Sequence, residues 1–368
     1  MLVINKNKIC CYLINIFFCL VFFRSLFPSG VFEALIVANL IIMVCFSKNI
    51  TKKQMNIFIL FSIFFSIVIS QVFITENVDY LAMHIIYLFQ GVMIFILIVY
   101  FSDFLGFKYV VSRLIFWAVL ASLISVILFV LFINTGYFSE FVYSRTGFPR
   151  LSGFQANPNY LSLTLCFIPV LLLIYKSKYV GFKIVVILLA IVLTGSRGGI
   201  LAAFIPLAIY FFIKNVRYSL YVLLVIIVII FIVNSIDLDS IYGLSRFQSS
   251  DGDYSSGRFT HWVRAWELFS NNIVYGVGNN SFLLYEIENG KPIQVHNNYL
   301  RVLAEFGIVG FFTWFFILYY LIKNSVSTVE SLLIIFPMLI FGLVNDPYIA
   351  KEFWLCLALC YKAEQGTR

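Results

Sequence analysis

Residues 111–133 read VSRLIFWAVLASLISVILFVLFI, an almost unbroken apolar run with one charged side chain, Arg113. A helix needs roughly 20 apolar residues to cross the hydrocarbon core of a membrane. Similar runs recur along the chain, so that 62% of its 368 residues are hydrophobic and only 11% are charged. A water-soluble domain does not carry this much apolar surface. The sequence therefore predicts an all-α, polytopic integral membrane protein.

The apolar runs predict about twelve membrane-spanning helices in a single transmembrane domain over residues 1–368. The first run ends in RSLFPSG rather than in the small residues of a signal-peptide cleavage site, so we interpret it as a retained span. The predicted spans lie near residues 9–27, 31–46, 55–74, 81–102, 111–133, 160–175, 179–195, 199–213, 218–235, 298–322, 329–344 and 348–362.

Basic residues between these runs predict the orientation of the chain. If the spans alternate, one set of cations falls on a single side, which is then cytoplasmic together with both termini. This set is Lys6, Lys8, Lys48, Lys52, Lys53, Lys176, Lys178, Lys183, Lys214, Arg217 and Lys323. The opposite face then carries residues 134–159 and one large periplasmic loop, residues 236–297. Because the cations are scattered, the net charge of +8 does not indicate nucleic-acid binding.

Cysteine and histidine usage argues against disulfides and metal sites. The seven Cys all fall in or beside apolar runs, and none lies in the large loop, so no disulfide framework is expected. Three His without a Cys-x-x-Cys pattern do not suggest a metal site. We therefore expect a function that uses neither a metal nor a cofactor.

The turn Thr194–Gly199 reads TGSRGG and places an Arg on the predicted periplasmic side. Its glycines permit backbone conformations closed to other residues and are expected to leave room for a ligand. The planar guanidinium of Arg197 suits phosphate oxygens. The alternative is that Arg197 extends to lipid headgroups. An Arg on this face opposes the usual charge bias, which favours a functional role.

Residues 295–311 read VHNNYLRVLAEFGIVGF at the start of a predicted span. On a continuous helix, His296 shares a stripe with Tyr299, and Glu305 lies about 13 Å deeper. Arg301 and Glu305 are four residues apart, so mutual charge neutralisation is their favoured role. His296 is a candidate proton acceptor, and the alternative is an interfacial His with a satisfied hydrogen bond.

Residues 257–271, GRFTHWVRAWELFSN, predict an amphipathic helix within the large loop. Such a helix either lies on the membrane surface or covers a cavity. Its apolar positions are Phe259, Trp262, Val263, Trp266 and Phe269.

Several Arg and one His are thus expected together at the periplasmic surface. Arg side chains can hold a diphosphate, and His can accept a proton from a hydroxyl near neutral pH. This combination favours transfer of a sugar from a lipid-diphosphate carrier to an alcohol, with Arg stabilising the leaving diphosphate. The alternative from another class is a flippase for the lipid-linked glycan, which needs polar residues along a path through the membrane.

Four stretches in this order resemble the O-antigen ligase and O-antigen polymerase (Wzy-type) membrane proteins of bacterial surface polysaccharide assembly. The resemblance covers about residues 140–312 and is carried by RLSGFQANPNYLSL (150–163), LTGSRGG (193–199), SGRFTHWVRAW with YGVGNNSF (256–282) and HNNYLRVLAEFGIVGF (296–311). It implies a polytopic glycosyltransferase that works without a metal at the periplasmic face of the bacterial inner membrane. Its implied donor is a glycan linked to undecaprenyl diphosphate.

The resemblance also implies roles for individual residues. Arg197 and Arg258 would hold the diphosphate, and His296 would act as the base or orient the acceptor. Arg264 is the alternative to Arg258 for the loop role. Further candidates for contact with substrate are Arg145, Arg150, Arg301 and Glu305. The side chains expected to cap the following helix are Asn157 and Asn159.

The shared motifs leave polymerase and ligase open. The Phe- and Ile-rich composition and the modest length favour a polymerase, which joins the glycan to the non-reducing end of another lipid-linked repeat unit. A chain-length regulator is then a candidate partner, besides the membrane lipids. A ligase would instead transfer the glycan to lipid A–core.

Overall fold

A computed structural model describes residues 6–28, 30–39 except 32, 35 and 38, 52–74, 78–144, 149–214, 258–283 and 294–363. The predicted span near 218–235, most of the one near 31–46, and Arg145 lie outside these residues. Of the predicted loop 236–297, the structure describes residues 258–283 and 294–297.

Within the described residues the fold is all-α, as predicted, with twelve α-helices and one short antiparallel ladder that pairs β1 (Val142–Tyr143) with β2 (Arg150–Leu151). The helices are α1 (Lys6–Phe22), α3 (Lys52–Ser70), α4 (Val78–Leu105), α5 (Phe107–Thr135), α6 (Pro158–Leu165), α7 (Ile168–Ile174), α8 (Val180–Leu193), α9 (Arg197–Lys214), α11 (Arg258–Asn271), α13 (Asn298–Lys323), α14 (Thr328–Phe341) and α15 (Lys351–Lys362).

Four described helices are long and apolar enough to cross a membrane, which is typical of a multi-pass integral membrane protein. These candidate spans are Ala82–Leu105, Phe107–Thr135, Arg197–Lys214 and Asn298–Lys323. Other apolar helices, such as α8 and α14, are shorter. The predicted total of about twelve spans therefore stays a prediction.

One predicted span, residues 160–175, is confirmed as the apolar helical stretch Pro158–Ile174, but it is not one regular helix. A turn at Cys166 and Phe167 divides it into α6 and α7. Pro169 lies in the first turn of α7. In a continuous helix its ring would clash with the carbonyl of Leu165, and it would have no amide hydrogen to donate there.

Helix α5 shows how these sequences pack in an apolar surround. Its inner side buries Leu114 and Ala118, whereas Phe116, Ile127 and Val130 remain about half exposed. Both sides are apolar, as expected of a helix between protein and lipid.

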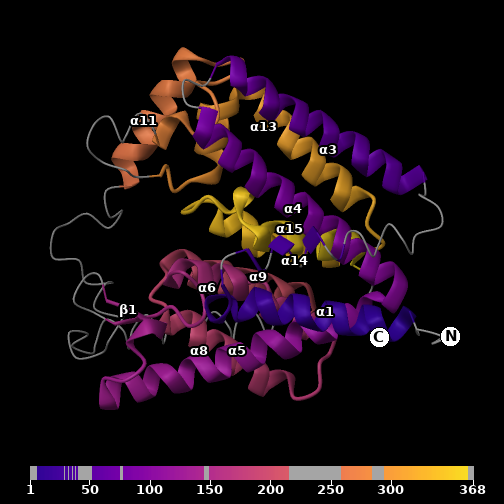
Figure 1. The fold of residues 1–368 in the computed structure, drawn as a ribbon, viewed down its shortest axis with the longest axis vertical. Coiled ribbons are helices and arrows are strands. Elements are labelled where there is room, and N and C mark those ends of the chain that lie inside the picture. Colours follow the sequence, from indigo (N-terminus) through magenta and orange to yellow (C-terminus); the bar gives the residue numbers. More distant parts are fainter. Residues whose placement is uncertain are drawn as a thin grey trace.

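Figure 1 shows α3 and α13 side by side along one edge, α4, α14 and α15 in the middle, and α5 and α8 along the opposite edge. Helix α15 packs against α4 and α14, and α14 packs in turn against α9. Helices α14 and α15 therefore lie between α13 on one side and α9 on the other. The turn that connects α14 to α15 can contact residues from both sides.

Candidate functional site

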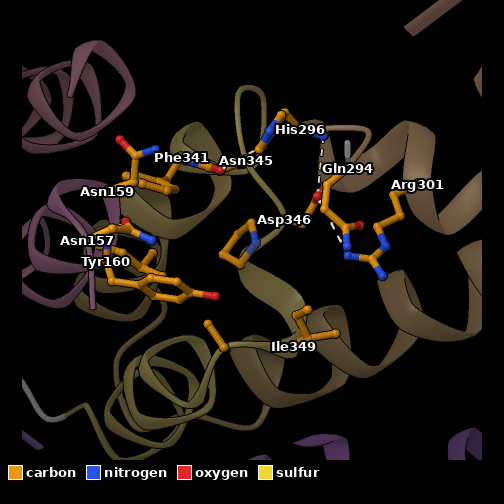
Figure 2. A pocket seen from close by; sticks show the side chains of 13 residues that line it. Asn157, Asn159, Tyr160, Gln294, His296, Arg301, Phe341, Asn345, Asp346 and Ile349 are labelled. Atoms are coloured by element: carbon orange, nitrogen blue, oxygen red, sulfur yellow. Dashed lines mark hydrogen bonds and ion pairs between the residues drawn. The ribbon is translucent and has the colours of Figure 1, made fainter. Parts of the chain in front are cut away.

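Three segments far apart in the sequence surround a cavity of about 240 Å³ (Figure 2). They are the start of α6, the residues before α13, and the turn between α14 and α15. Its polar lining residues are Asn157, Asn159, Tyr160, Gln294, His296, Arg301, Asn345 and Asp346.

His296 lines the cavity from just before α13. Its φ of 53° is left-handed, and α13 begins only at Asn298, so the predicted helical stripe through His296 and Tyr299 is wrong. Its backbone nitrogen donates to Asp346 Oδ2 over 3.3 Å, and its ring Nδ1 lies 3.3 Å from Asn345 Oδ1. Because an amide oxygen only accepts, this contact requires hydrogen on Nδ1, which leaves the Nε2 lone pair to take a proton.

The two Asn after His296 attach the start of α13 to the turn that follows α14. Asn297 caps α13 by accepting from the amides of Tyr299 and Leu300, and its Nδ2 donates to Leu343 O over 3.2 Å. Asn298 Oδ1 accepts from the backbone nitrogen of Tyr348 over 3.1 Å. The HNN motif therefore fixes residues 343–348, which supply the partners of His296.

Arg301 lies at the centre of a buried polar network behind His296. Its Nε donates to Glu305 over 3.1 Å, its Nη2 donates to Asn280 over 2.9 Å, and its Nη1 lies 3.6 Å from Asp346. The exposed fractions of the Arg301 and Glu305 side chains are 2% and 0%. Glu305 also accepts from the Tyr348 hydroxyl over 3.3 Å. The predicted neutralising pair is confirmed, and it extends to Asp346, which in turn holds His296.

A break in α13 at Gly307 receives residues 273–278 of the large loop. The φ of 61° and ψ of −163° at Gly307 interrupt the helical hydrogen bonds. The freed groups bond to the loop instead: Val277 N donates to Ala304 O over 2.8 Å, and Ile308 N donates to Ile273 O over 2.8 Å. A Cβ at Gly307 would lie 2.3 Å from Val274 O. This docking brings Asn280 to Arg301.

Burial and the charges around His296 set its protonation state. Burial lowers the pKa of His296 below its ordinary 6.5, the carboxylate of Asp346 opposes this, and the positive charge of Arg258 lowers the pKa further. Together these effects lower the pKa of His296, so its imidazole is neutral near pH 7. Arg258 therefore lies within electrostatic range of His296.

Arg258 and Arg264 lie on different faces of α11. Arg258 precedes His261 and Ala265, which form the buried face against α13. Six residues later, Arg264 is rotated by about 120° from Arg258 around the helix axis. The predicted apolar face is divided: Phe259 is 65% and Trp266 53% exposed, as suits contact with a membrane surface, whereas Trp262 packs inward against Ala265 and Phe282.

Arg150 lies beneath the cavity wall rather than on it. Its Nε donates to Thr194 O over 2.7 Å, and its Nη2 donates to Asn159 Oδ1 over 3.3 Å. Its side chain is buried. Arg150 thus connects the TGSRGG turn to α6, which places it as a support for the site rather than at the cavity surface where a glycan would lie.

The two Asn of the NPN sequence have different positions. Asn157 caps α6 by accepting from the backbone nitrogen of Tyr160 over 3.0 Å, as predicted. For Asn159 the predicted capping role is wrong, because this residue lies inside the first turn and its side chain accepts from Arg150. It faces the cavity instead.

The TGSRGG turn ends α8 and begins α9 at Arg197. Gly195 has a φ of 59°, which confirms its conformational role. The expected space for a ligand at the next two glycines is wrong, because a Cβ on Gly198 would lie 2.3 Å from Val344 and one on Gly199 would lie 2.4 Å from Ser162. These glycines permit close packing. The packing sets Gly198 of α9 against Val344, the residue before Asn345 and Asp346, and Arg197 is half-buried at this N-terminus but does not line the cavity.

Asn345 and Asp346 were missed by the sequence reasoning, although both hold His296. Their signal is the tetrapeptide NDPY, residues 345–348, which interrupts two apolar runs on the predicted periplasmic side. Polar residues between two spans are ordinary in a loop, so this sequence alone does not indicate a site. The fold shows that the turn contacts His296 and Asn298.

No curated protein matches the chain. A protein-family model, described as O-antigen ligase (Wzy_C), matches residues 182–315. The matched stretch contains Arg197, Arg258, His296 and the Arg301–Glu305 pair, whereas the cavity walls at α6 and at residues 341–350 lie outside it. The resemblance seen in the sequence to the O-antigen ligase family is thereby confirmed over residues 182–315 of this chain.

Proposed function

We propose that this protein is a polysaccharide polymerase. It transfers a glycan from undecaprenyl diphosphate to the non-reducing end of another lipid-linked repeat unit. The observation that carries the proposed glycan transfer is His296, with a lowered pKa and its Nδ1 beside Asn345, facing a cavity with an Arg within electrostatic range; the choice of a polymerase rests on the composition and length of the chain. Such a residue suits a general base beside an anionic leaving group.

In the proposed step, His296 Nε2 takes the proton from the acceptor hydroxyl, and the oxygen attacks the anomeric carbon of the donor sugar. The bond between that carbon and the diphosphate oxygen breaks, and undecaprenyl diphosphate leaves with the electron pair. Arg197 and Arg258 hold the diphosphate and stabilise its added charge. Asp346 and Asn345 keep the imidazole oriented and favour the protonated form as it develops.

The proposed catalytic region comprises residues 140–312 with the loop 236–297. The network around Asp346 supports its extension to residue 350. We place the site at the periplasmic face of the bacterial inner membrane, because the HNN start of α13 follows the large loop and the cations of the other loops assign that loop to the outside. Transfer without a metal remains part of the proposal.

The second candidate is a ligase that transfers the glycan to lipid A–core, and the description of the matching family model favours it. The general base and the diphosphate clamp serve either acceptor. A flippase is less well supported, since the polar residues of the cavity come from helix ends and turns rather than from a path along helices.

A lipopolysaccharide gel from a strain that lacks this gene tests the proposal. A single repeat unit on the core means that ligation continues and polymerisation is lost, as we expect. Core without O-antigen, together with lipid-linked polymer in the membrane, means that the protein is a ligase. Unchanged polymer on the core rejects both.

A further inference from the structure

A second cavity of about 290 Å³ adjoins the first, close to the lower end of the range for small-molecule sites, roughly 300–1,000 Å³. The residues that matter for its chemistry are Arg24, Ser25, Phe27, Glu33 and Phe154. Ala156 lines this cavity, and its neighbour Asn157 lines the first one. One stretch of chain before α6 therefore forms a wall of both.

The wall between α1 and residues 154–156 is held by hydrogen bonds within the protein. Ser25 N donates to Phe154 O over 3.1 Å, and Gln155 Nε2 donates to Val21 O over 2.9 Å at the end of α1. Phe23 packs on Phe154 with ring centroids 4.6 Å apart. The position of the backbone that carries Arg24 is thus set by the fold.

The charges around the second cavity balance. Arg24 and Glu33 line it, and both lie within electrostatic range of Lys351, which precedes the buried Glu352. Two cations and two carboxylates sum to zero, in contrast to the Arg residues proposed to clamp a diphosphate at the first cavity. A neutral group rich in hydroxyls fits this setting, since Arg donates, carboxylates accept and Ser does both. The ring of Phe154 is buried against Phe23 and Phe141, so Phe154 supports the wall, and the polar contacts to a sugar come from Arg24, Ser25 and Glu33.

Tyr160 lines the first cavity from α6, three residues after the wall residue Asn157. Figure 2 shows its ring pointing from α6 into the first cavity. Its phenol lies within electrostatic range of Arg24 and Glu352, and also of Asp346 and Arg301. Because Ala156 lines the second cavity and the next residue, Asn157, lines the first, the proposed path of a sugar chain runs from the second cavity past Asn157 and Tyr160 towards His296.

We infer that the second cavity binds sugar residues of the acceptor glycan and so presents the acceptor hydroxyl to His296. The inference rests on the proposed function for the identity of the acceptor. Binding of the acceptor glycan does not require glycan transfer, so the binding site and the proposed function can be tested separately.

The test uses the full-length protein in detergent and the repeat-unit oligosaccharide released by mild acid from lipid-linked material of a strain that lacks this gene. The oligosaccharide carries a fluorophore at its reducing end, and fluorescence anisotropy gives its Kd. Arg24→Ala and the isosteric Glu33→Gln should each raise the Kd tenfold or more. The control is Arg113→Ala, because Arg113 lies over the Tyr109 ring in α5 and lines neither cavity.

Transfer in proteoliposomes separates the two claims. We expect Arg24→Ala and Glu33→Gln to raise the KM for the acceptor while the KM for the donor stays within twofold. Polymerisation with an unchanged acceptor KM in both variants would overturn the second site and leave the proposed function intact. Oligosaccharide binding that depends on Arg24 in a protein without polymerase activity would support the site and contradict the function. Equal loss of binding in Arg113→Ala would also overturn the site.

Discussion

Asp346 accepts a hydrogen bond from the backbone nitrogen of His296 over 3.3 Å with the same oxygen that lies 3.6 Å from Arg301 Nη1. This carboxylate joins the candidate base to the buried Arg301–Glu305 pair. The carboxylate of Asp346 raises the pKa of His296 and so opposes the lowering by burial. The polar residues at the start of α13 therefore form one electrostatic unit.

The first prediction concerns pH. The pKa of His296 is lowered below 6.5, so the base is already deprotonated at neutral pH. The value of kcat/KM should be flat from pH 7 to 8 and should fall only as the pH drops through the lowered pKa, because protonation then removes the base. Asp346→Asn removes the charge that raises this pKa, so the fall should begin at a still lower pH. An acid limb that moves upward in Asp346→Asn would contradict the assignment.

The two Arg of α11 should differ in effect. Arg258→Ala should lower kcat by about 100-fold or more, as loss of a charge-stabilising donor does. Arg264→Ala, a matched change about 120° away on the same helix, should keep activity within threefold. Initial rates in proteoliposomes measure both. If both variants lost kcat equally, the two Arg would act by stabilising α11 rather than by contact with the diphosphate. If Arg264→Ala lost more kcat than Arg258→Ala, the role of holding the diphosphate would pass to Arg264.

Glu305 should matter for stability more than for chemistry. Removing one partner of a buried ion pair costs about 3–5 kcal/mol, so Glu305→Ala should lower the Tm of the detergent-solubilised protein strongly. Glu305→Gln should lower it less, since the amide oxygen still accepts from Arg301 or Tyr348. Its folded fraction should retain a specific activity well above that of His296→Ala. A Tm equal to that of the wild type in Glu305→Ala would show that the pair is not structural.

Gly307 should tolerate no side chain. Its φ of 61° with ψ of −163° is open essentially to Gly alone, and a Cβ would overlap Val274 O at 2.3 Å. Gly307→Ala should therefore detach residues 273–278 from α13 and abolish activity. Gly181→Ala in α8 is the matched control, because nothing lies within 4 Å of its Cβ position, and it should be neutral or slightly stabilising. Limited proteolysis of the large loop would report the detachment, and an unchanged cleavage pattern in Gly307→Ala would contradict it.

The sequence could predict what depends on local pattern. Apolar runs predicted α4, α5, α9 and α13, and the spacing of Arg301 and Glu305 predicted their pair. Local pattern could not show that His296 leaves the helix, because its left-handed φ is stabilised by Asn345 and Asp346, some 50 residues away. Nor could it show that Gly198 accommodates Val344 rather than a ligand. Contacts of this kind belong to the tertiary fold, and periodicity carries no information about them.

The most direct test of the account is the rate of glycan transfer by His296→Ala in proteoliposomes with purified lipid-linked repeat unit. A general base contributes about 10²–10⁴-fold, so kcat should fall by that factor while the protein still inserts and binds the lipid-linked donor with unchanged affinity. A kcat within threefold of the wild type would contradict the central claim that His296 takes the proton of the acceptor.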